Sequence, residues 1–214
     1  MTERAPLVLA TRSAGKLREL RALCAAAGWT SASLDECGVA EEAAEEGIEC
    51  FDTFEQNARA KARWFAARLP GRAILAEDSG LEVDALAGRP GVHSKRWAGA
   101  AATGAALDAA NNAALARALE GAPDRRARYR CVAVLRAGAH EWTADGRVEG
   151  AIADAARGSG GFGYDPWFVS DELARTFAEA TPEEKARVSH RGRAVRAVLE
   201  RAELALRAYV PRVE

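Results

Sequence analysis

"PLVLATRSAGKLRELRALCAAAG", residues 6–28, changes its hydrophobic spacing part of the way along. Residues 6–10 are a short apolar run, which is typical of a buried strand. After the loop that follows, Leu17, Leu20 and Cys24 recur at helical spacing until Gly28 ends the pattern. The chain therefore opens with a strand, a loop and a helix, which is how an α/β fold begins.

The remainder of the chain alternates between the same two kinds of spacing, after an irregular acidic segment over 35–52. The expected elements are a helix over 53–71 capped by Thr53, a buried strand over 73–80, a helix over 103–119, paired antiparallel strands over 127–152, and two helices over 181–192 and 193–206. This order predicts an α/β fold with a mixed sheet and flanking helices.

Composition limits the kind of protein that this chain can be. Its 30 Lys and Arg residues against 31 Asp and Glu give a net charge of -1, so no overall positive field attracts nucleic acid or an anionic membrane. The four cysteines and three histidines fit neither a disulfide scaffold nor a zinc site. We expect one domain over residues 1–214 and a cytoplasmic location, since no apolar leader or membrane-length run is present.

The loop "ATRSAGK", residues 10–16, is the first candidate site. It stands where a strand gives way to a helix, and the backbone N–H groups and dipole of a helix start attract anions. Its side chains add two hydroxyls and two cations, from Thr11, Arg12, Ser13 and Lys16. Phosphate is the expected ligand, although the loop is no Walker A motif and such turns are also common for structural reasons.

"AEDSG", residues 76–80, is the second candidate site. Glu77 and Asp78 are adjacent carboxylates at the expected end of a buried strand, where they repel one another unless a cation or a proton relieves them. Mg²⁺ fits, because it takes one or two protein carboxylates beside phosphate oxygens. The alternative is a solvated turn in which Asp78 and Ser79 cap a chain reversal.

Two groups of polar side chains on helices are weaker candidates. Asn57 and Lys61 stand four residues apart, so both project from one helix face. The segment over 181–192 brings cations and donors together near a helix end, from Lys185, Ser189, His190 and Arg191. Taken alone, the spacing of Asn57 and Lys61 is more often that of a solvated helix surface, and the group over 181–192 is as typical of an ordinary basic helix end as of a binding site.

"GSGGFGYDPWF", residues 158–168, surrounds two aromatic rings with glycines. Glycine lets a backbone approach a ligand closely, and rings beside an Asp suit a partner with a flat face and polar edges, such as a nucleobase. This reading takes in Phe162, Gly163, Tyr164 and Asp165. The alternative is a hairpin turn with Phe162 and Tyr164 in the core.

Five motifs occur in one order along the chain. They are TxxxxK from Thr11, TFEQNA from Thr53, EDSG from Glu77, GFGYDP from Gly161 and SHRG from Ser189. In this combination the sequence resembles the inosine triphosphate pyrophosphatase family, whose members hydrolyse non-standard purine nucleoside triphosphates such as ITP, dITP and XTP. The resemblance covers nearly the whole chain and implies an elongated mixed sheet, two lobes with the active site in the cleft between them, and a homodimer.

The resemblance also implies roles for individual residues. Thr11, Ser13 and Lys16 would hold the triphosphate with help from Lys61, and Mg²⁺ would be bound by Glu49, Glu77 and Asp78, with Asp78 as the base that activates water. Phe162 would stack on the purine, whose edge would be read by Asp165, Lys185, His190 and Arg191, while Ser94 and Arg96 would lie near the cleft.

The match departs from the family in places, and two other functions compete with it. Arg12-Ser13 replaces the Gly-Asn of many relatives, and Glu77 stands where an Asp is common. In the acidic segment Glu49 is our first choice as metal ligand and Glu46 our second. The competing functions are a Maf-type nucleotide pyrophosphatase with another base preference, and a nucleotide-binding sensor without turnover.

Overall fold

The computed structural model describes residues 5–99 and 101–208, whose helices and strands follow the predicted alternation. In chain order they are β1 (Leu7–Leu9), α1 (Ala14–Ala26), β2 (Ser31–Ser33), η1 (Ala43–Gly47), α2 (Phe54–Arg68), β3 (Ile74–Val83), η2 (Asp84–Leu86), η3 (Gly91–Arg96), α3 (Gly104–Ala118), β4 (Arg126–Ala137), β5 (His140–Ile152), β6 (Phe168–Ser170), β7 (Arg175–Thr176), α4 (Pro182–Val188) and α5 (His190–Ala208), where η marks a 3-10 helix.

The strands form a mixed sheet in the order β2-β1-β3-β4-β5-β6-β7. Strand β1 runs parallel to β2 and to β3, whereas β6 is antiparallel to both β5 and β7. The predicted α/β fold with a mixed sheet and flanking helices is therefore confirmed. No helix within the described residues has the length and apolarity needed to cross a membrane.

Helix starts lie where the sequence predicts them, because side-chain oxygens satisfy the first backbone N–H groups. Thr53 caps α2 by accepting from the N–H of Gln56, and Thr181 caps α4 by accepting from that of Glu184. Glu184 also accepts from the N–H of Thr181, which completes a capping box.

Two boundaries differ from the prediction. Strand β3 does not end at its acidic residues but continues to Val83, because Leu81 and Val83 are buried on the far side of them. The helical break near the C-terminus falls at Ser189, so His190 opens α5 and does not close the helix before it.

The chain forms two compact units. The first comprises residues 1–78, 132–145 and 193–214, and the second comprises 79–131 and 146–192. The prediction of one domain over 1–214 remains a prediction. Strands β3, β4 and β5 each carry residues of both units, and the boundary inside β3 is the peptide bond between Asp78 and Ser79.

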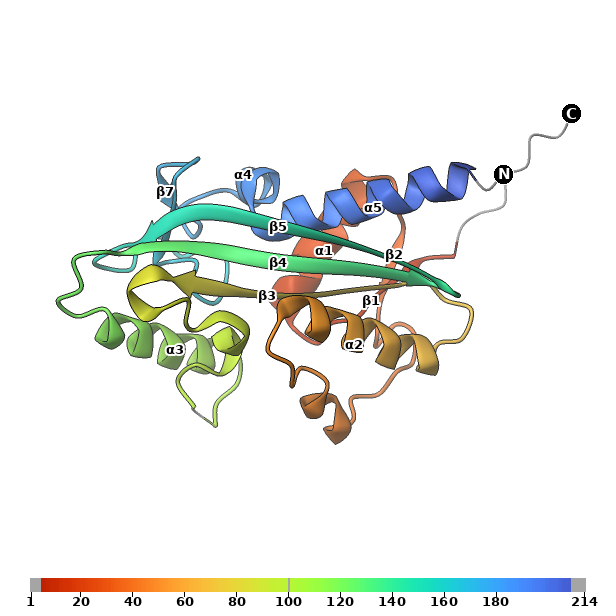
Figure 1. Ribbon diagram of the computed structural model, residues 1–214, viewed down its shortest axis with the longest axis horizontal. Helices are drawn as coiled ribbons and strands as arrows, with labels where there is room; N and C mark the ends of the chain where they lie inside the picture. Colours follow the sequence, from red (N-terminus) through yellow and green to blue (C-terminus); the bar gives the residue numbers. More distant parts are fainter. Residues whose placement is uncertain (1–4, 100, 209–214) are drawn as a thin grey trace, which may run out of the picture. The chain divides into compact units, whose positions relative to one another are not determined.

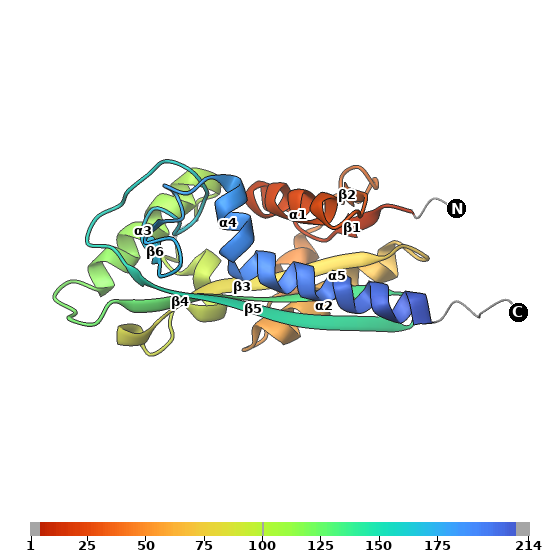
Figure 2. The ribbon, with the colours of Figure 1, turned by 90° about the horizontal axis from the view of Figure 1, so that it is seen from above.

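In the first unit, helices cover both faces of the strands. Helix α2 lies on one face and α5 on the opposite face (Figure 1), while α1 runs beside β1 and β2 (Figure 2). Strand β1 is completely buried, as are Ile74 and Leu75 of β3. This packing fixes the loop between β1 and α1 and the acidic part of β3.

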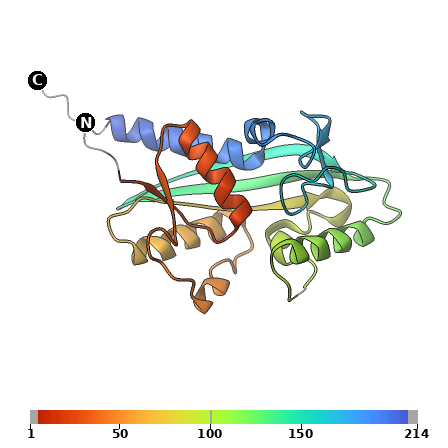
Figure 3. The ribbon, with the colours of Figure 1, turned by 180° about the vertical axis from the view of Figure 1, so that it is seen from behind.

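The second unit has its own hydrophobic core. Helices α3 and α4 lie on opposite faces of its strands (Figure 3). The core includes Tyr129, Phe168 and Phe177, whose rings pack on one another. Residues of the glycine-rich segment and of the start of α5 lie around this core.

Candidate functional site

The loop between β1 and α1 has the form of an anion site. Ser13 is the N-cap of α1 and accepts from the N–H of Lys16 at 3.4 Å, while Thr11 accepts from the N–H of Ser13 at 3.2 Å. The hydroxyls of Thr11 and Ser13 and the amine of Lys16 therefore gather at the start of a helix of 13 residues. A helix start of this kind favours phosphate.

Carboxylates and lysines alternate beside this loop. Nζ of Lys16 lies 2.8 Å from Oε1 of Glu77, and Nζ of Lys61 donates to the carboxylate of Glu49 and, at 3.0 Å, to the carbonyl oxygen of Glu77. Glu77 and Asp78 are 2% and 6% exposed, so their charges are removed from water. Paired lysines are what makes such buried carboxylates tolerable.

The electrostatics of the three carboxylates differ. Burial alone would raise the pKa of Glu49, but the ammonium groups of Lys61 and Lys16 outweigh burial and lower that pKa to about 2. Burial raises the pKa of Asp78 above its ordinary value, although the same two lysines oppose the shift. Of these two carboxylates, Asp78 has the stronger tendency to take a proton.

Asn57 positions Asp78. Its amide nitrogen donates to Oδ2 of Asp78 at 3.0 Å and to the carbonyl oxygen of Phe51 at 3.2 Å, and its amide oxygen accepts from the N–H of Phe51 at 2.9 Å. The side chain is buried, so the helix-surface alternative does not hold for it. Asn57 thus links the carboxylate of Asp78 to the backbone of Phe51 and fixes the position of that carboxylate.

Arg12 of the predicted ligand set is engaged by protein groups in this structure. Its Nε and Nη2 donate to the two carboxylate oxygens of Glu45 at 3.0 and 2.8 Å, and Nη1 donates to Asp35 at 2.7 Å. Nη1 and Nη2 also donate to the carbonyl oxygens of Val39 and Ala40, each at 3.0 Å. A guanidinium has five N–H groups, and all five are used within the protein.

Glu49 fits the metal-ligand prediction better than the other acids of its segment. Its charge interacts with those of Glu77 and Asp78, whereas Glu46 is exposed and Glu45 is paired with Arg12. Over residues 5–99 and 101–208, however, no group of three or more His, Cys, Asp or Glu side chains is arranged as a metal site. The lysines neutralise the carboxylates in this structure.

We call Thr11, Ser13, Lys16, Glu49, Lys61, Glu77 and Asp78 the first-unit cluster.

The glycine-rich segment belongs to the second unit and is held by its backbone. Asp165 accepts from the N–H of Phe162 at 2.8 Å and from Nζ of buried Lys185. A Cβ at Gly161 would come within 2.1 Å of Oδ2 of Asp165, and the backbone there has φ of +73°. Only glycine fits at this position.

Helix α3 fixes the same segment from another side. The N–H of Gly163 donates to Asp108 at 2.8 Å, and its carbonyl oxygen accepts from Asn112 at 3.0 Å. These two residues were not among the predicted ones. Their signal in the sequence is a pair of polar side chains four residues apart in an alanine-rich helix, which marks one face of that helix.

The two aromatic rings of the segment differ in role. The ring of Phe162 is half-buried, with Nζ of Lys185 4.9 Å and Cζ of Arg191 5.6 Å from its centre. Tyr164 is buried in the core, and its hydroxyl donates to the carbonyl oxygen of Ser94 at 2.8 Å. The ring and the hydroxyl of Tyr164 thus serve the core, as the alternative reading expected, and the assignment of Tyr164 as a substrate-binding residue remains a prediction.

His190 and Arg191 are the first two residues of α5, directly after the break at Ser189. The imidazole stacks on Tyr129 with ring centres 4.5 Å apart, and Nη2 of Arg191 donates to Ser79 at 2.9 Å. Both side chains are buried, at 3% and 2% exposed, which is unlike a solvated basic helix end. We call Ser79, Phe162, Gly163, Asp165, Lys185, His190 and Arg191 the second-unit cluster.

Ser94 and Arg96 fit their predicted place unequally. Ser94 is buried, accepts from the N–H of Leu81 at 2.8 Å and donates to the carbonyl oxygen of Gly91, so it holds η3 against β3. Arg96 is exposed. The cleft in which the resemblance places both residues remains a prediction.

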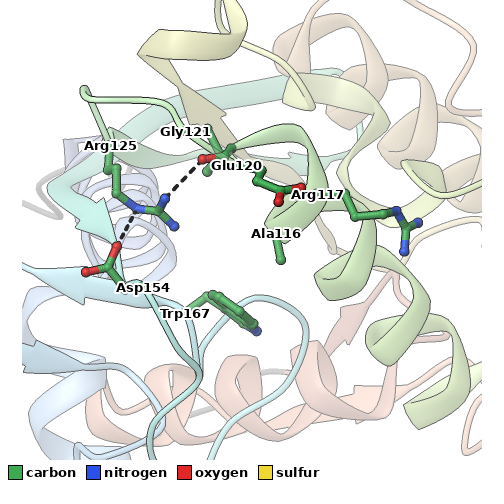
Figure 4. A pocket seen from close by; sticks show the side chains of 8 residues that line it. Ala116, Arg117, Glu120, Gly121, Arg125, Asp154 and Trp167 are labelled. Carbon is green, nitrogen blue, oxygen red and sulfur yellow. Dashed lines mark hydrogen bonds and ion pairs between the residues drawn. The ribbon is translucent and has the colours of Figure 1, made fainter.

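A pocket of about 350 Å³ lies elsewhere in the second unit, at the end of α3 (Figure 4). Arg125 occupies one wall and donates to the carbonyl oxygens of Leu119, Ile152 and Ala153. Its charge is thus balanced by the end of α3 and, at 3.4 Å, by Asp154. None of the predicted site residues lines this pocket.

Comparison with known proteins gives a consistent result. The profile of the Ham1 family matches residues 7–201. Proteins named dITP/XTP pyrophosphatase from Geobacter sulfurreducens and Symbiobacterium thermophilum are 46% and 49% identical to this chain, over 88% and 91% of it and 92% and 93% of their own length. The solved structure of a HAM1 protein from Coxiella burnetii is similar with a TM-score of 0.76 and 37% identity, covering 96% of this chain and 100% of its own.

Proposed function

This chain belongs to the Ham1 family. We propose that it hydrolyses non-standard purine nucleoside triphosphates, with a separate role for each of the two clusters. The name that its relatives share, dITP/XTP pyrophosphatase, supports this substrate class, and the resemblance seen in the sequence is confirmed. The observation that carries the proposal is the set of three carboxylates, Glu49, Glu77 and Asp78, balanced by two lysines beside a helix start.

The first-unit cluster would bind the triphosphate. Backbone N–H groups at the start of α1 and the hydroxyls of Thr11 and Ser13 offer donors to phosphate oxygens. Lys16 and Lys61, which here neutralise Glu77 and Glu49, would turn to the leaving pyrophosphate and stabilise its charge.

The same carboxylates fit Mg²⁺. Their oxygens are the ligands that this hard cation prefers, and Glu49, Glu77 and Asp78 are close enough to interact through their charges. When bound, Mg²⁺ would neutralise charge on the phosphate oxygens and lower the pKa of nearby water.

Asp78 would act as the general base. It takes a proton from the water that attacks the α-phosphorus, and the bond from that phosphorus to the oxygen bridging the α and β phosphates breaks. The products are a nucleoside monophosphate and pyrophosphate. Asn57 holds the carboxylate of Asp78 in one orientation through Oδ2, as a positioned base requires.

The second-unit cluster would bind the purine. Phe162 offers a ring for stacking, and Arg191 and His190 lie at the same helix start as donors. Hypoxanthine and xanthine present an oxygen acceptor at the six-position, whereas adenine presents an amine that would leave such donors unpaired. This polarity would favour ITP, dITP and XTP over ATP.

One assay tests the function against its competitors. Formation of the nucleoside monophosphate is measured directly by chromatography across ITP, dITP, XTP, GTP, ATP and pyrimidine nucleotides, with Mg²⁺ or with excess EDTA. We expect turnover of the three non-standard purines that stops in EDTA. Preference for other bases would indicate a Maf-type enzyme, binding without turnover would indicate a sensor, and full activity in EDTA would contradict the metal.

Two further properties rest on the resemblance. A homodimer and a cytoplasmic location, in which the enzyme removes deaminated purines from the nucleotide pool, fit this substrate class. Size-exclusion chromatography with light scattering measures the molar mass in solution and so tests the dimer directly.

A further inference from the structure

Arg12 stands between Thr11 and Ser13 in the phosphate loop, yet its side chain is committed to the acidic segment. Every N–H group of its guanidinium donates within the protein, and the fork to Glu45 is bidentate. The pair is sheltered, with side chains 18% and 12% exposed. A charge-assisted bidentate contact of this kind restrains geometry more strongly than a single exposed ion pair.

The restraint from Arg12 acts on the stretch that carries Glu49. Glu45 lies in η1, which ends two residues before Glu49. On the far side of Glu49, the backbone of Phe51 is held at both its N–H and its carbonyl oxygen by Asn57. Glu49 therefore lies between two anchors, and Arg12 supplies the first of them.

Little else orders the segment before Glu49. Over residues 41–47 every residue except Glu45 is exposed, so burial of apolar surface contributes little there, although Ile48 next to Glu49 is buried. Arg68 of α2 also makes a bidentate pair with Glu42, but those side chains are 30% and 47% exposed. Exposed ion pairs contribute little to stability, which leaves Arg12 as the main side-chain restraint on residues 41–47.

We propose that Arg12 is a positioning residue that ties the phosphate loop to the acidic segment and thereby holds Glu49 in place for the metal, and that it does not itself bind phosphate. This inference rests on the proposed function for its catalytic consequence. Its structural part, the tie between the loop and the segment, stands independently of the reaction.

The test uses Arg12→Ala, Glu45→Ala and the double variant. We measure hydrogen exchange of the amides over 41–51, and the Mg²⁺ concentration that gives half the maximal rate of ITP hydrolysis. Each single change should speed exchange and raise the Mg²⁺ requirement by about tenfold, the lower end for loss of an outer-shell partner. The double variant should be no worse than Arg12→Ala, because the contact with Glu45 is already lost in that single variant. Arg12→Lys should not restore the wild-type values, since an ammonium lacks the planar fork.

The matched control is Arg68→Ala, which removes a bidentate pair from the same segment and should change neither measurement by more than about twofold. If Arg12 bound phosphate, Arg12→Ala would raise the KM for ITP while Glu45→Ala had no effect and exchange stayed unchanged; that pattern overturns the inference. If the wild-type protein fails to hydrolyse ITP, the proposed function fails, and unchanged exchange in Arg12→Ala would still separately overturn the tie.

Discussion

The two clusters are held in place by different means. In the first unit, charged side chains hold one another, as Lys16 does with Glu77 and Lys61 with Glu49. In the second unit the backbone is fixed first, and Phe162 follows from a segment that Asp165 and α3 clamp at its N–H and carbonyl groups. Charge pairs can exchange partners when a charged ligand arrives, whereas a clamped backbone presents one shape.

This difference separates two tasks of a selective hydrolase. Under the proposed function, the first-unit cluster would redistribute its charges during phosphate chemistry, and the second-unit cluster would keep a fixed surface that selects among bases. Changes in the first cluster should therefore alter turnover, and changes in the second should alter binding and selectivity.

Asp78→Asn tests the first half of this comparison and should have the largest effect. The amide keeps the size of the side chain but cannot accept a proton, so kcat for ITP should fall by about a hundredfold or more. Binding of ITP, followed by calorimetry, should persist. Turnover close to wild type would remove Asp78 from the mechanism and place the base elsewhere.

Phe162→Ala and Arg191→Ala test the second half, and the two should fail differently. Stacking does not depend on base identity, so Phe162→Ala should weaken all purine triphosphates by about 1–3 kcal/mol. Arg191→Ala should reduce kcat/KM for ITP and XTP by about tenfold and leave that for ATP nearly unchanged. Steady-state kinetics on ITP and ATP measure both.

An unchanged ITP/ATP ratio in Arg191→Ala would show that the guanidinium serves only Ser79. A drop in melting temperature for Phe162→Ala without a change in KM would likewise assign that ring to the core.

Gly161→Ala should act on the second cluster through its backbone. The added methyl collides with Asp165, which should disturb the pair with Lys185 and raise the KM for every purine triphosphate. Gly138→Ala is the control: it has a left-handed φ of +57° with open space around it, and should lose about 1 kcal/mol of stability from backbone strain alone. Equal KM values in both variants would contradict the clamp.

Alkaline pH should lower the free energy of unfolding slightly, through one buried group in each unit. Burial raises the pKa of the Cys24 thiol in α1 from 9.0 to about 12, and burial, then the charge of Asp108, raises that of Tyr164 above 10.0. Each group keeps its proton when folded and loses it when unfolded, so the free energy of unfolding falls as pH rises, by at most about 1.4 kcal/mol per pH unit and group.

Denaturation of the wild type, Cys24→Ala and Tyr164→Phe measures this effect. The stability difference between the wild type and Cys24→Ala should shrink from about pH 9, and that for Tyr164→Phe from about pH 10. Parallel pH curves for all three proteins would contradict the shifts.

Much of the fold follows from local patterns in the sequence. Thr53 and Thr181 mark helix starts correctly because capping depends on nearby residues alone. The end of β3 was misplaced because polar Glu77 and Asp78 look like a strand end, and only the packing of Leu81 and Val83 shows that the strand continues.

The site was predictable in part for the same reason. Motifs point to Lys16, Asp78 and Phe162 by residue type and order. In the structure each of the three contacts another predicted residue of its own unit. The fates of Arg12 and Tyr164 were not readable, because their partners, Glu45 and Ser94, lie far away along the chain. Long-range partners decide whether a polar group faces a ligand or the protein.

The division of the chain into units also has a consequence for biosynthesis. The first unit draws on residues 1–78, 132–145 and 193 onward, whereas the second needs nothing beyond residue 192. A ribosome that has delivered residue 192 has therefore supplied all of the second unit, while the first still lacks the part of α5 over 193–208. The first unit is therefore begun before the second and completed after it, because its last segment, residues 193–208 of α5, is made only when the whole second unit already exists.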